Sequence, residues 1–241
     1  MKLHTVRAGS GVPPILFIHG LGSSAATWAA CMELLGRHYE VVAVDLPGHG
    51  QSPVPQDPAE YTRDGALADI DEIIATLGLR PVLVGHSLGG YLALAHAVTR
   101  PGAARAIVVE NTGPGFRDPA KREAWNERSR RNAHRFGIPV EAAGLNLQHD
   151  SLVMDHLADI DVPTLVLAGD LDRPEFIASG QYMERKMPSA RLAVVEGGEH
   201  SMHEQSHAAD VARLIEDFLA TLPAEVDSPP ERWQSGQMRT P

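Results

Sequence analysis

The sequence predicts an α/β protein in which a mostly parallel sheet is covered by helices on both faces and carries a short helical insertion. Short apolar runs rich in β-branched residues alternate with longer segments of helical periodicity along most of the 241 residues. Most of these runs are apolar throughout, as expected for strands buried on both faces. The composition, with 43% hydrophobic and 22% charged residues, is globular and excludes wholesale disorder.

The strands and helices are predicted from these runs in chain order. Parallel strands are expected at residues 15–19, 41–45, 82–85, 106–110, 164–168 and 192–196, and an antiparallel edge strand at residues 3–6. Helices are expected at residues 64–77, 88–98 and 208–222. The first helix has apolar residues at positions 67, 70, 73, 74 and 77, which form one stripe, whereas the second is apolar nearly all round and is expected to be buried.

Two segments depart from this alternation. Residues 112–161 form an insertion that contains Gly, Pro and a charged helix. Residues 223–241 contain four prolines and no periodicity, so we predict a disordered tail, with a short docking segment around Trp233 as the alternative. The expected organisation is therefore one folded domain over residues 1–222 followed by the tail.

Charge and cysteine content exclude several classes of protein. The net charge is −10, which does not suit binding to a nucleic-acid backbone. Cys31 is the only cysteine, so no intramolecular disulfide can form. No apolar run approaches the roughly 18 residues of a membrane-spanning helix. We expect a cytoplasmic protein with no membrane or nucleic-acid partner, and the sequence does not specify an oligomeric state.

The strongest motif lies between a buried strand and an apolar helix. Residues 85–90 read GHSLGG, a G-x-S-x-G nucleophile elbow, in which small flanking residues allow a tight turn that exposes Ser87. The amino terminus of the following helix adds amides where negative charge would develop. The sequence therefore predicts Ser87 as a nucleophile.

A serine nucleophile needs a base and an orienting carboxylate, which this architecture supplies in the order Ser, Asp, His. Asp170 and Asp172 follow the strand predicted at 164–168, and His200 follows the strand predicted at 192–196. Both lie at carboxyl ends of strands, where open α/β sheets place their sites. His200 is the predicted base, and either aspartate could orient it.

Two backbone amides are expected to stabilise the oxyanion. One belongs to Leu88, directly after the nucleophile, and the other to Leu21, in the glycine-rich loop after the first parallel strand. That loop has no GxxxxGK[ST] or GxGxxG pattern, so we expect no nucleotide site and no cofactor. His203 and His207 have helical spacing, but no third ligand or HExxH pattern accompanies them, and we expect no metal site.

Together these residues resemble the α/β-hydrolase superfamily, of the small-lid serine esterase type. The resemblance spans roughly residues 10–222 and includes His19-Gly20, the DLPGHGQS turn at residues 45–52, the GHSLGG elbow, G-x-x-D at 169–172 and GGEH at 197–200. It implies the α/β-hydrolase fold. It favours Asp172 over Asp170 as the triad acid, with Glu110 a distant third, and a structural role for the 45–52 turn. Serine at the nucleophile position argues against the epoxide hydrolase and haloalkane dehalogenase branches.

The resemblance also implies that the insertion at about residues 112–161 is a lid. Asp118-Pro119 starts its charged helix, and we expect Trp125 and Phe136 to face the substrate pocket. Six basic and two acidic residues leave a net charge of +4 between Lys121 and Arg135. This stretch is either a solvated helix face or a basic rim, formed by Arg128, Arg130 and Arg131, that attracts anionic substrates.

The predicted function is hydrolysis of carboxylic esters of small or medium size through an acyl-enzyme intermediate. Lactonase, thioesterase, cofactor-free carbon–carbon bond hydrolase and perhydrolase or haloperoxidase activities use the same triad and remain alternatives. A ligand receptor built on a hydrolase fold is a further alternative of a different class.

Overall fold

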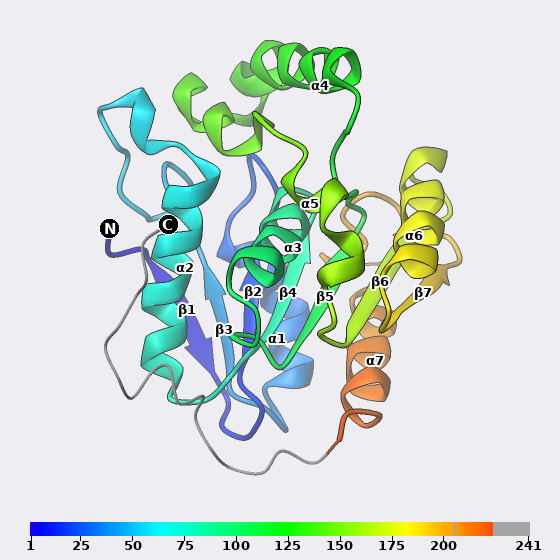
Figure 1. Cartoon of the computed structure of the whole chain (residues 1–241). Helices are drawn as coiled ribbons and strands as arrows, with labels where there is room; N and C mark the ends of the chain where they lie inside the picture. Colours follow the sequence, from blue (N-terminus) through cyan, green and yellow to red (C-terminus); the bar gives the residue numbers. More distant parts are fainter. Residues whose placement is uncertain (205, 224–241) are drawn as a thin grey trace.

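A computed structural model describes residues 1–204 and 206–223, which are arranged around a seven-stranded sheet (Figure 1). The strand order is β1-β3-β2-β4-β5-β6-β7; β1 is antiparallel to β3, and every other neighbouring pair is parallel. The strands are β1 (Thr5–Ala8), β2 (Ile15–Ile18), β3 (Val41–Val44), β4 (Val82–His86), β5 (Ala106–Glu110), β6 (Thr164–Gly169) and β7 (Ala190–Val195). The predicted fold class is confirmed.

Helices cover both faces of the sheet (Figure 1). The α-helices outside the insertion are α1 (Ala29–Leu35), α2 (Arg63–Leu77), α3 (Leu88–Thr99), α6 (Pro174–Lys186) and α7 (Ala208–Leu219). Short 3-10 helices η1 (Ala25–Trp28) and η2 (Pro58–Glu60) lie in two of the loops. No helix in the described part of the chain is long and apolar enough to cross a membrane.

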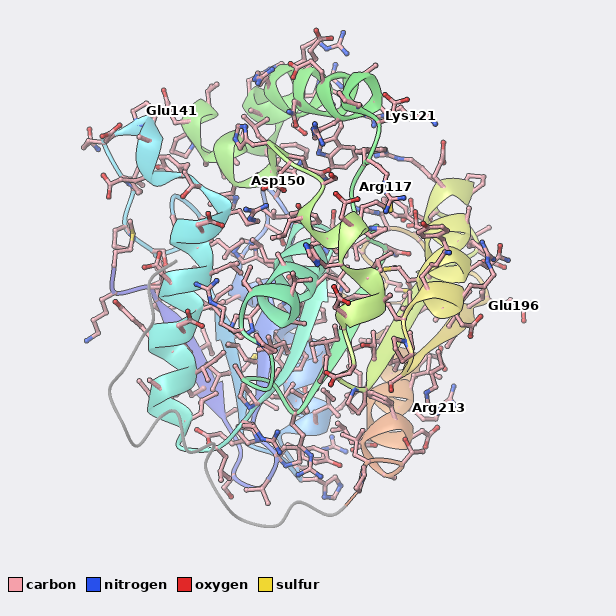
Figure 2. The ribbon with its side chains drawn as sticks, in the orientation of Figure 1. Arg117, Lys121, Glu141, Asp150, Glu196 and Arg213 are labelled. Atoms are coloured by element: carbon pink, nitrogen blue, oxygen red, sulfur yellow. The ribbon has the colours of Figure 1, made fainter. Side chains whose placement is uncertain are left out.

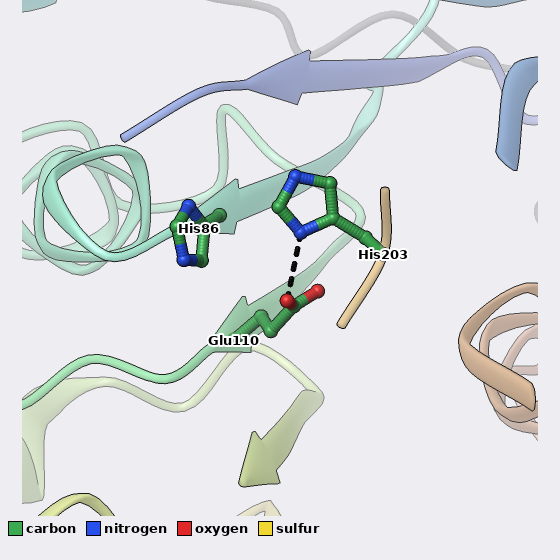
Figure 3. A group of neighbouring side chains, drawn as sticks. All are labelled: His86, Glu110 and His203. Carbon is green, nitrogen blue, oxygen red and sulfur yellow. Dashed lines mark hydrogen bonds and ion pairs between the residues drawn. The ribbon is translucent and has the colours of Figure 1, made fainter. Parts of the chain in front are cut away.

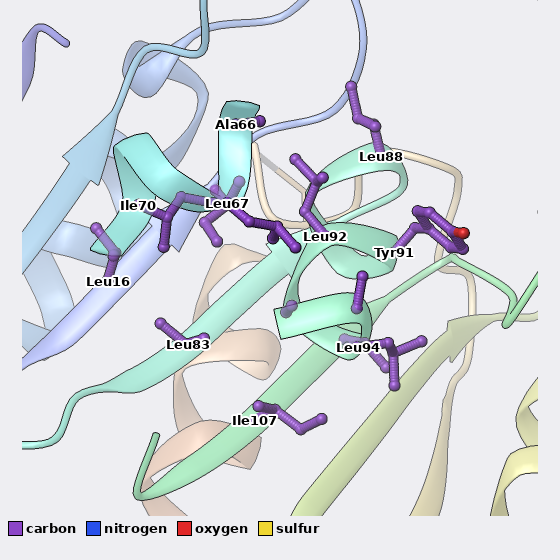
Figure 4. Packing of buried hydrophobic residues seen from close by; sticks show 14 of the residues in the cluster. Leu16, Ala66, Leu67, Ile70, Leu83, Leu88, Tyr91, Leu92, Leu94 and Ile107 are labelled. Atoms are coloured by element: carbon purple, nitrogen blue, oxygen red, sulfur yellow. The ribbon is translucent and has the colours of Figure 1, made fainter. Parts of the chain in front are cut away.

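The five central strands, β2 to β6, contribute alternate side chains to two separate apolar clusters, which is why these strands are apolar throughout. Leu16 and Ile18 belong to the cluster that includes α2, α3 and α6, whereas Phe17 belongs to the cluster that includes α1 and α7. Figure 4 shows the first cluster, with Leu67 of α2 and Leu92 of α3 on the side of the sheet that carries Leu83. The two clusters fix the sheet between two helical layers.

All of the predicted strands are present, and the edge strand is displaced along the chain. It runs over Thr5–Ala8 instead of residues 3–6, because Leu3 is buried in the core before pairing with β3 begins at Thr5. Helices α1 and α6 were not predicted individually, and α7 ends at Leu219, earlier than the expected residue 222. The predicted tail at residues 223–241, with Trp233, lies outside the described residues apart from Pro223.

The insertion, residues 112–161, connects β5 to β6 and places α4 beyond the carboxyl ends of the strands (Figure 1). Its elements are α4 (Pro119–Asn132), η3 (Ala133–Phe136), η4 (Val140–Asn146), α5 (Leu152–Asp155) and η5 (Leu157–Asp159). The Asp118 carboxylate caps α4 by accepting from the Ala120 and Lys121 amides, as its Asp-Pro start predicts.

Polar contacts, instead of an apolar face, attach α4 to the rest of the insertion. Its buried residues are Asn126 and Ser129. The Asn126 amide donates to the Gln148 carbonyl and accepts from the Gln148 N–H, both at 2.8 Å. Trp125 Nε1 donates to the Asn146 carbonyl at 3.0 Å. These hydrogen bonds hold α4 against residues 146–148 of the insertion.

Candidate active site

Ser87 occupies a strained turn between β4 and α3. Its φ of 50° and ψ of −111° lie in a region that non-glycine residues rarely adopt. The turn requires glycine on both sides, because a Cβ at Gly85 would overlap the Gly89 carbonyl and a Cβ at Gly89 would overlap the Ile18 carbonyl. Hydrogen bonds from the Ser87 N–H to the Glu110 carbonyl (2.9 Å) and from Thr112 Oγ1 to the Ser87 carbonyl (2.7 Å) hold it against β5.

The loop after β2 lies directly against this turn. A Cβ at Gly20 would come within 3.3 Å of Ser87 Cβ and 2.8 Å of His86 Nδ1. Within the described residues, the amides of Leu21 and Leu88 have no hydrogen-bond acceptor. Two unpaired amides therefore lie on segments that meet at Ser87, as an oxyanion site requires.

Two buried histidines hold the loop after β2 to the turn after β3. His19 Nδ1 donates to the Gly20 carbonyl at 2.7 Å, and its Nε2 accepts from the Leu46 amide at 3.0 Å. His49 Nε2 accepts from the Gly22 amide at 3.1 Å. Burial lowers the pKa of His19 to about 4 and also lowers the pKa of His49, so both rings are neutral near pH 7 and can accept these bonds.

Each of the three candidate carboxylates has a different partner. Asp172 Oδ2 accepts from His200 Nδ1 at 2.6 Å, and its side chain is only 6% exposed. Asp170 Oδ1 accepts from the Gly197 amide at 2.7 Å and so braces the turn before His200. Glu110 Oε1 accepts from His203 Nδ1 at 2.7 Å. The geometry pairs His200 with Asp172.

Asn111 connects the two loops that carry this pair. Its Nδ2 donates to the carbonyls of Glu199 (2.9 Å) and His200 (2.8 Å), and its Oδ1 accepts from the Gly169 amide at 2.9 Å. The residue is 1% exposed and has a positive φ of 45°, which asparagine tolerates better than most residues. All three of its side-chain bonds therefore fix the loop after β6 and the loop after β7 to the end of β5.

His86, Glu110 and His203 form a buried group beneath the turn (Figure 3). Their potential metal-ligand atoms lie within 4.8 Å of one another, and they are the one such group among the described residues. His203 Nδ1 is already bonded to Glu110, Trp28 stacks on the His203 ring at 3.9 Å, and His86 Nε2 donates to the His200 carbonyl at 2.8 Å. These contacts support the loop that carries His200. Burial lowers the pKa of His86 well below its usual value, so this ring is neutral near pH 7.

The structure brings His200 against neighbours of Ser87, and no hydrogen bond joins Ser87 to His200 within the described residues. The ring of His86, the residue before Ser87, lies 4.8 Å from the His200 ring, measured between centroids. Phe176 lies 5.2 Å from His200 and lines the same cavity as Ser87. Such bonds are often long or absent before substrate binds.

A cavity of about 270 Å³ lies over Ser87, between the insertion and α6. Trp125 lines this cavity, as expected from the sequence, together with Phe116, Arg128 and Arg173. Phe136 does not line it: the residue is 43% exposed and lies against Gly22, in the loop after β2.

The basic residues predicted to form one rim are separated by the structure. Arg128 lines the cavity, and its guanidinium lies 5.1 Å from the Trp125 ring centroid. Arg131 lines a neighbouring hollow. Arg130 instead pairs with Glu123 at 2.8 Å on the exposed side of α4, so it is not part of a rim.

Residues 15–214 match the family described as the alpha/beta hydrolase family. The chain belongs to this family. The (E)-2-((N-methylformamido)methylene)succinate hydrolase of Acinetobacter baylyi is 30% identical over 258 residues, which cover 91% of this chain and 95% of that protein. The pimeloyl-(acyl-carrier protein) methyl ester esterase of Xanthomonas campestris is 28% identical over 261 residues, which cover 92% of this chain and all of that protein.

Solved structures agree with the alpha/beta hydrolase assignment. A thermophilic esterase from Thermogutta terrifontis has a TM-score of 0.76 at 26% identity, covering 91% of this chain and 93% of that one. The sequence motifs of the alpha/beta hydrolase indicated the loops that meet at the site. They did not indicate Asn111, Arg173 or Gln148, because none of these residues belongs to a motif and each reaches the site only through the packing of distant segments.

Proposed function

We propose that this alpha/beta hydrolase cleaves carboxylic esters of small or medium size through a covalent acyl-enzyme. The observation that carries the proposal is the strained Ser87 turn between two unpaired amides, with the bonded pair of His200 and Asp172 beside it. Relatives named as a methyl ester esterase and a thermophilic esterase support ester cleavage.

In the proposed reaction, Ser87 Oγ attacks the ester carbonyl carbon and its proton passes to His200 Nε2. The Leu21 and Leu88 amides hold the oxyanion, and Asp172 stabilises the charged imidazole through Nδ1. Collapse of the intermediate breaks the bond to the alcohol, which leaves with the proton from His200. Water then attacks the acyl-enzyme with His200 as base, and the acid and free Ser87 are released.

The insertion is proposed to act as the lid over this site. It supplies Trp125 and Phe116 to the cavity wall, and a mostly enclosed cavity suits a small acyl or alcohol group. Lactones and thioesters present the same carbonyl to Ser87, so a screen across esters of varied chain length, lactones and thioesters identifies the preferred bond. Sustained multiple turnover would separate an enzyme from a hydrolase-fold receptor, which would stop after at most one.

Replacing Ser87 with alanine tests the proposal. We expect the Ser87→Ala variant to lose at least about 1,000-fold in kcat for p-nitrophenyl acetate, because the nucleophile is absent. A fluorophosphonate should also add to Ser87 in the unmodified protein, as located by peptide mass spectrometry. Ser189→Ala, which changes an exposed serine, is the control. Retained turnover in Ser87→Ala would refute the role of Ser87.

A further inference from the structure

A second hollow, of about 390 Å³, adjoins the Ser87 cavity on the surface of the insertion. Its lining residues are Phe116, Lys121, Ala124, Trp125, Arg128 and Arg131. Phe116, Trp125 and Arg128 also line the Ser87 cavity, so the two spaces share one wall. Lys121 lies in the first turn of α4, beyond the carboxyl ends of the strands (Figure 2).

The outer hollow is lined by cations without a carboxylate. Within the described residues, Lys121, Arg128 and Arg131 form no ion pair. Two other arginines of the insertion are paired: Arg117 with Asp155 at 2.7 Å and Arg130 with Glu123 at 2.8 Å. Three cations of the insertion that form no ion pair therefore lie together at this hollow, and they focus a positive potential there.

The inner cavity has a different polarity. Its lining includes one carboxylate, Glu175, together with the guanidinium groups of Arg128 and Arg173. Gln148 also lines it, and its Oε1 atom is buried with no hydrogen-bond partner among the described residues. A buried acceptor without a donor is costly unless a ligand supplies one. An uncharged polar group thus suits the inner cavity, whereas an anion suits the outer hollow.

We propose that the two spaces form one substrate site for esters that carry an anionic group away from the scissile bond. The ester carbonyl lies at Ser87, the chain passes Trp125 and Phe116, and the distal anion contacts Arg128, Arg131 and Lys121. A carboxylate matches the fork of a guanidinium in two parallel hydrogen bonds. The substrate class is thus the half ester of a dicarboxylic acid; this inference rests on the proposed function of Ser87.

Matched substrates test the inference. Mono-p-nitrophenyl esters of succinate, glutarate and adipate are compared with neutral p-nitrophenyl esters of equal acyl length. We expect the ratio of kcat/KM for charged over neutral ester to rise with chain length, because the anion must reach past Trp125. The same ratio should fall with added salt, which screens exposed charges. A ratio below one at every length would overturn the inference.

Variants of α4 locate the effect. Arg131→Gln and Arg128→Gln should each lower that ratio about tenfold, mainly through KM. Arg130→Gln is the matched control: it removes the same charge from the same helix at a position paired with Glu123, and the ratio should stay within about twofold. Because Arg128 also packs on Trp125, Arg131→Gln, which leaves that wall intact, decides the result. Equal effects of Arg131→Gln and Arg130→Gln would overturn the inference.

A binding measurement separates this inference from the proposed function. Adipate is titrated calorimetrically into the unmodified protein and into Arg131→Gln. Weaker binding to the variant supports the anion site even if Ser87 has no esterase activity. Ser87-dependent ester cleavage without adipate binding or charge preference would overturn the anion site and leave the proposed function intact.

Discussion

At the level of single residues, the loop after β6 carries two aspartates that have different hydrogen-bond partners. Asp172 faces His200, whereas Asp170 accepts the Gly197 amide. The two residues are two positions apart on one loop. Substituting each in turn therefore compares the loss of the contact with His200 with the loss of the contact with the Gly197 amide. A carboxylate that orients histidine also stabilises the imidazolium that forms during catalysis.

Asp172→Asn should therefore lower kcat for p-nitrophenyl acetate by roughly 1,000- to 10,000-fold, because the amide favours the wrong histidine tautomer and cannot balance its charge. Asp170→Asn is the control. Its side-chain oxygen can still accept from Gly197, so kcat should change less than about threefold. Steady-state kinetics of both proteins gives the answer, and equal losses would contradict the assignment of Asp172.

At the level of elements, the end of β5 organises the site. Glu110 and Asn111 are consecutive, and they bond to His203 and to the two loops that carry Asp172 and His200. The glycines of these loops permit their close approach, since a Cβ at Gly169 would overlap the Gly198 carbonyl. A substitution of Asn111 should therefore separate Asp172 from His200 without changing the identity of either residue.

Asn111→Asp should destabilise the protein by about 2–4 kcal/mol and lower kcat, because it replaces a donor with a carboxylate that faces two carbonyl oxygens. Urea unfolding at pH 7.5 measures the stability, and the pH profile of kcat/KM reports on His200. Asn111→Gly removes the bonds but tolerates the positive φ, so it should lose less stability. An unchanged pH profile and kcat in both variants would exclude a positioning role.

The strands and their loops could be predicted because their signals are local. Apolar runs reflect burial on both faces. Glycine is required at 85, 89 and 169, because the backbone of another segment lies too close for a Cβ at these positions. The insertion could not be predicted in the same way. Its helix α4 is attached by hydrogen bonds from Asn126 to Gln148 and from Trp125 to Asn146. Such polar contacts leave no periodic pattern in the sequence.

For the same reason, the direction of Phe136 could not be derived from the sequence. Helical spacing with Trp125 predicted a shared face, but α4 ends at Asn132 and η3 follows, which changes the spacing. The pairing of Arg130 with Glu123 was equally hidden, because the two residues are seven apart and Glu127, three positions before Arg130, could have competed. Which charges remained unpaired was decided by the fold.

For the whole molecule, buried neutral histidines make stability depend on pH. Burial lowers the pKa values of His19, His49 and His86, and His19 titrates at about 4. Unfolding exposes these rings and returns them to an ordinary pKa near 6.5. Above that pH both states are neutral, and the histidines add no pH dependence. Below it the unfolded state binds protons that the native state refuses, so stability falls with pH.

The free energy of unfolding should therefore decrease between pH 7 and pH 4.5, by an amount on the order of 2 kcal/mol from His19 alone. Urea unfolding at several pH values measures this decrease. The pH values stay above the range in which Asp45 would protonate, because hydrogen bonds from two backbone amides and from His4 lower the pKa of Asp45 from 3.8. His19→Gln keeps an acceptor for the Leu46 amide and does not titrate, so its stability should change less with pH. His134→Gln, at an exposed position, should keep the full slope; an equal slope in all three proteins would show that the buried rings do not control acid unfolding.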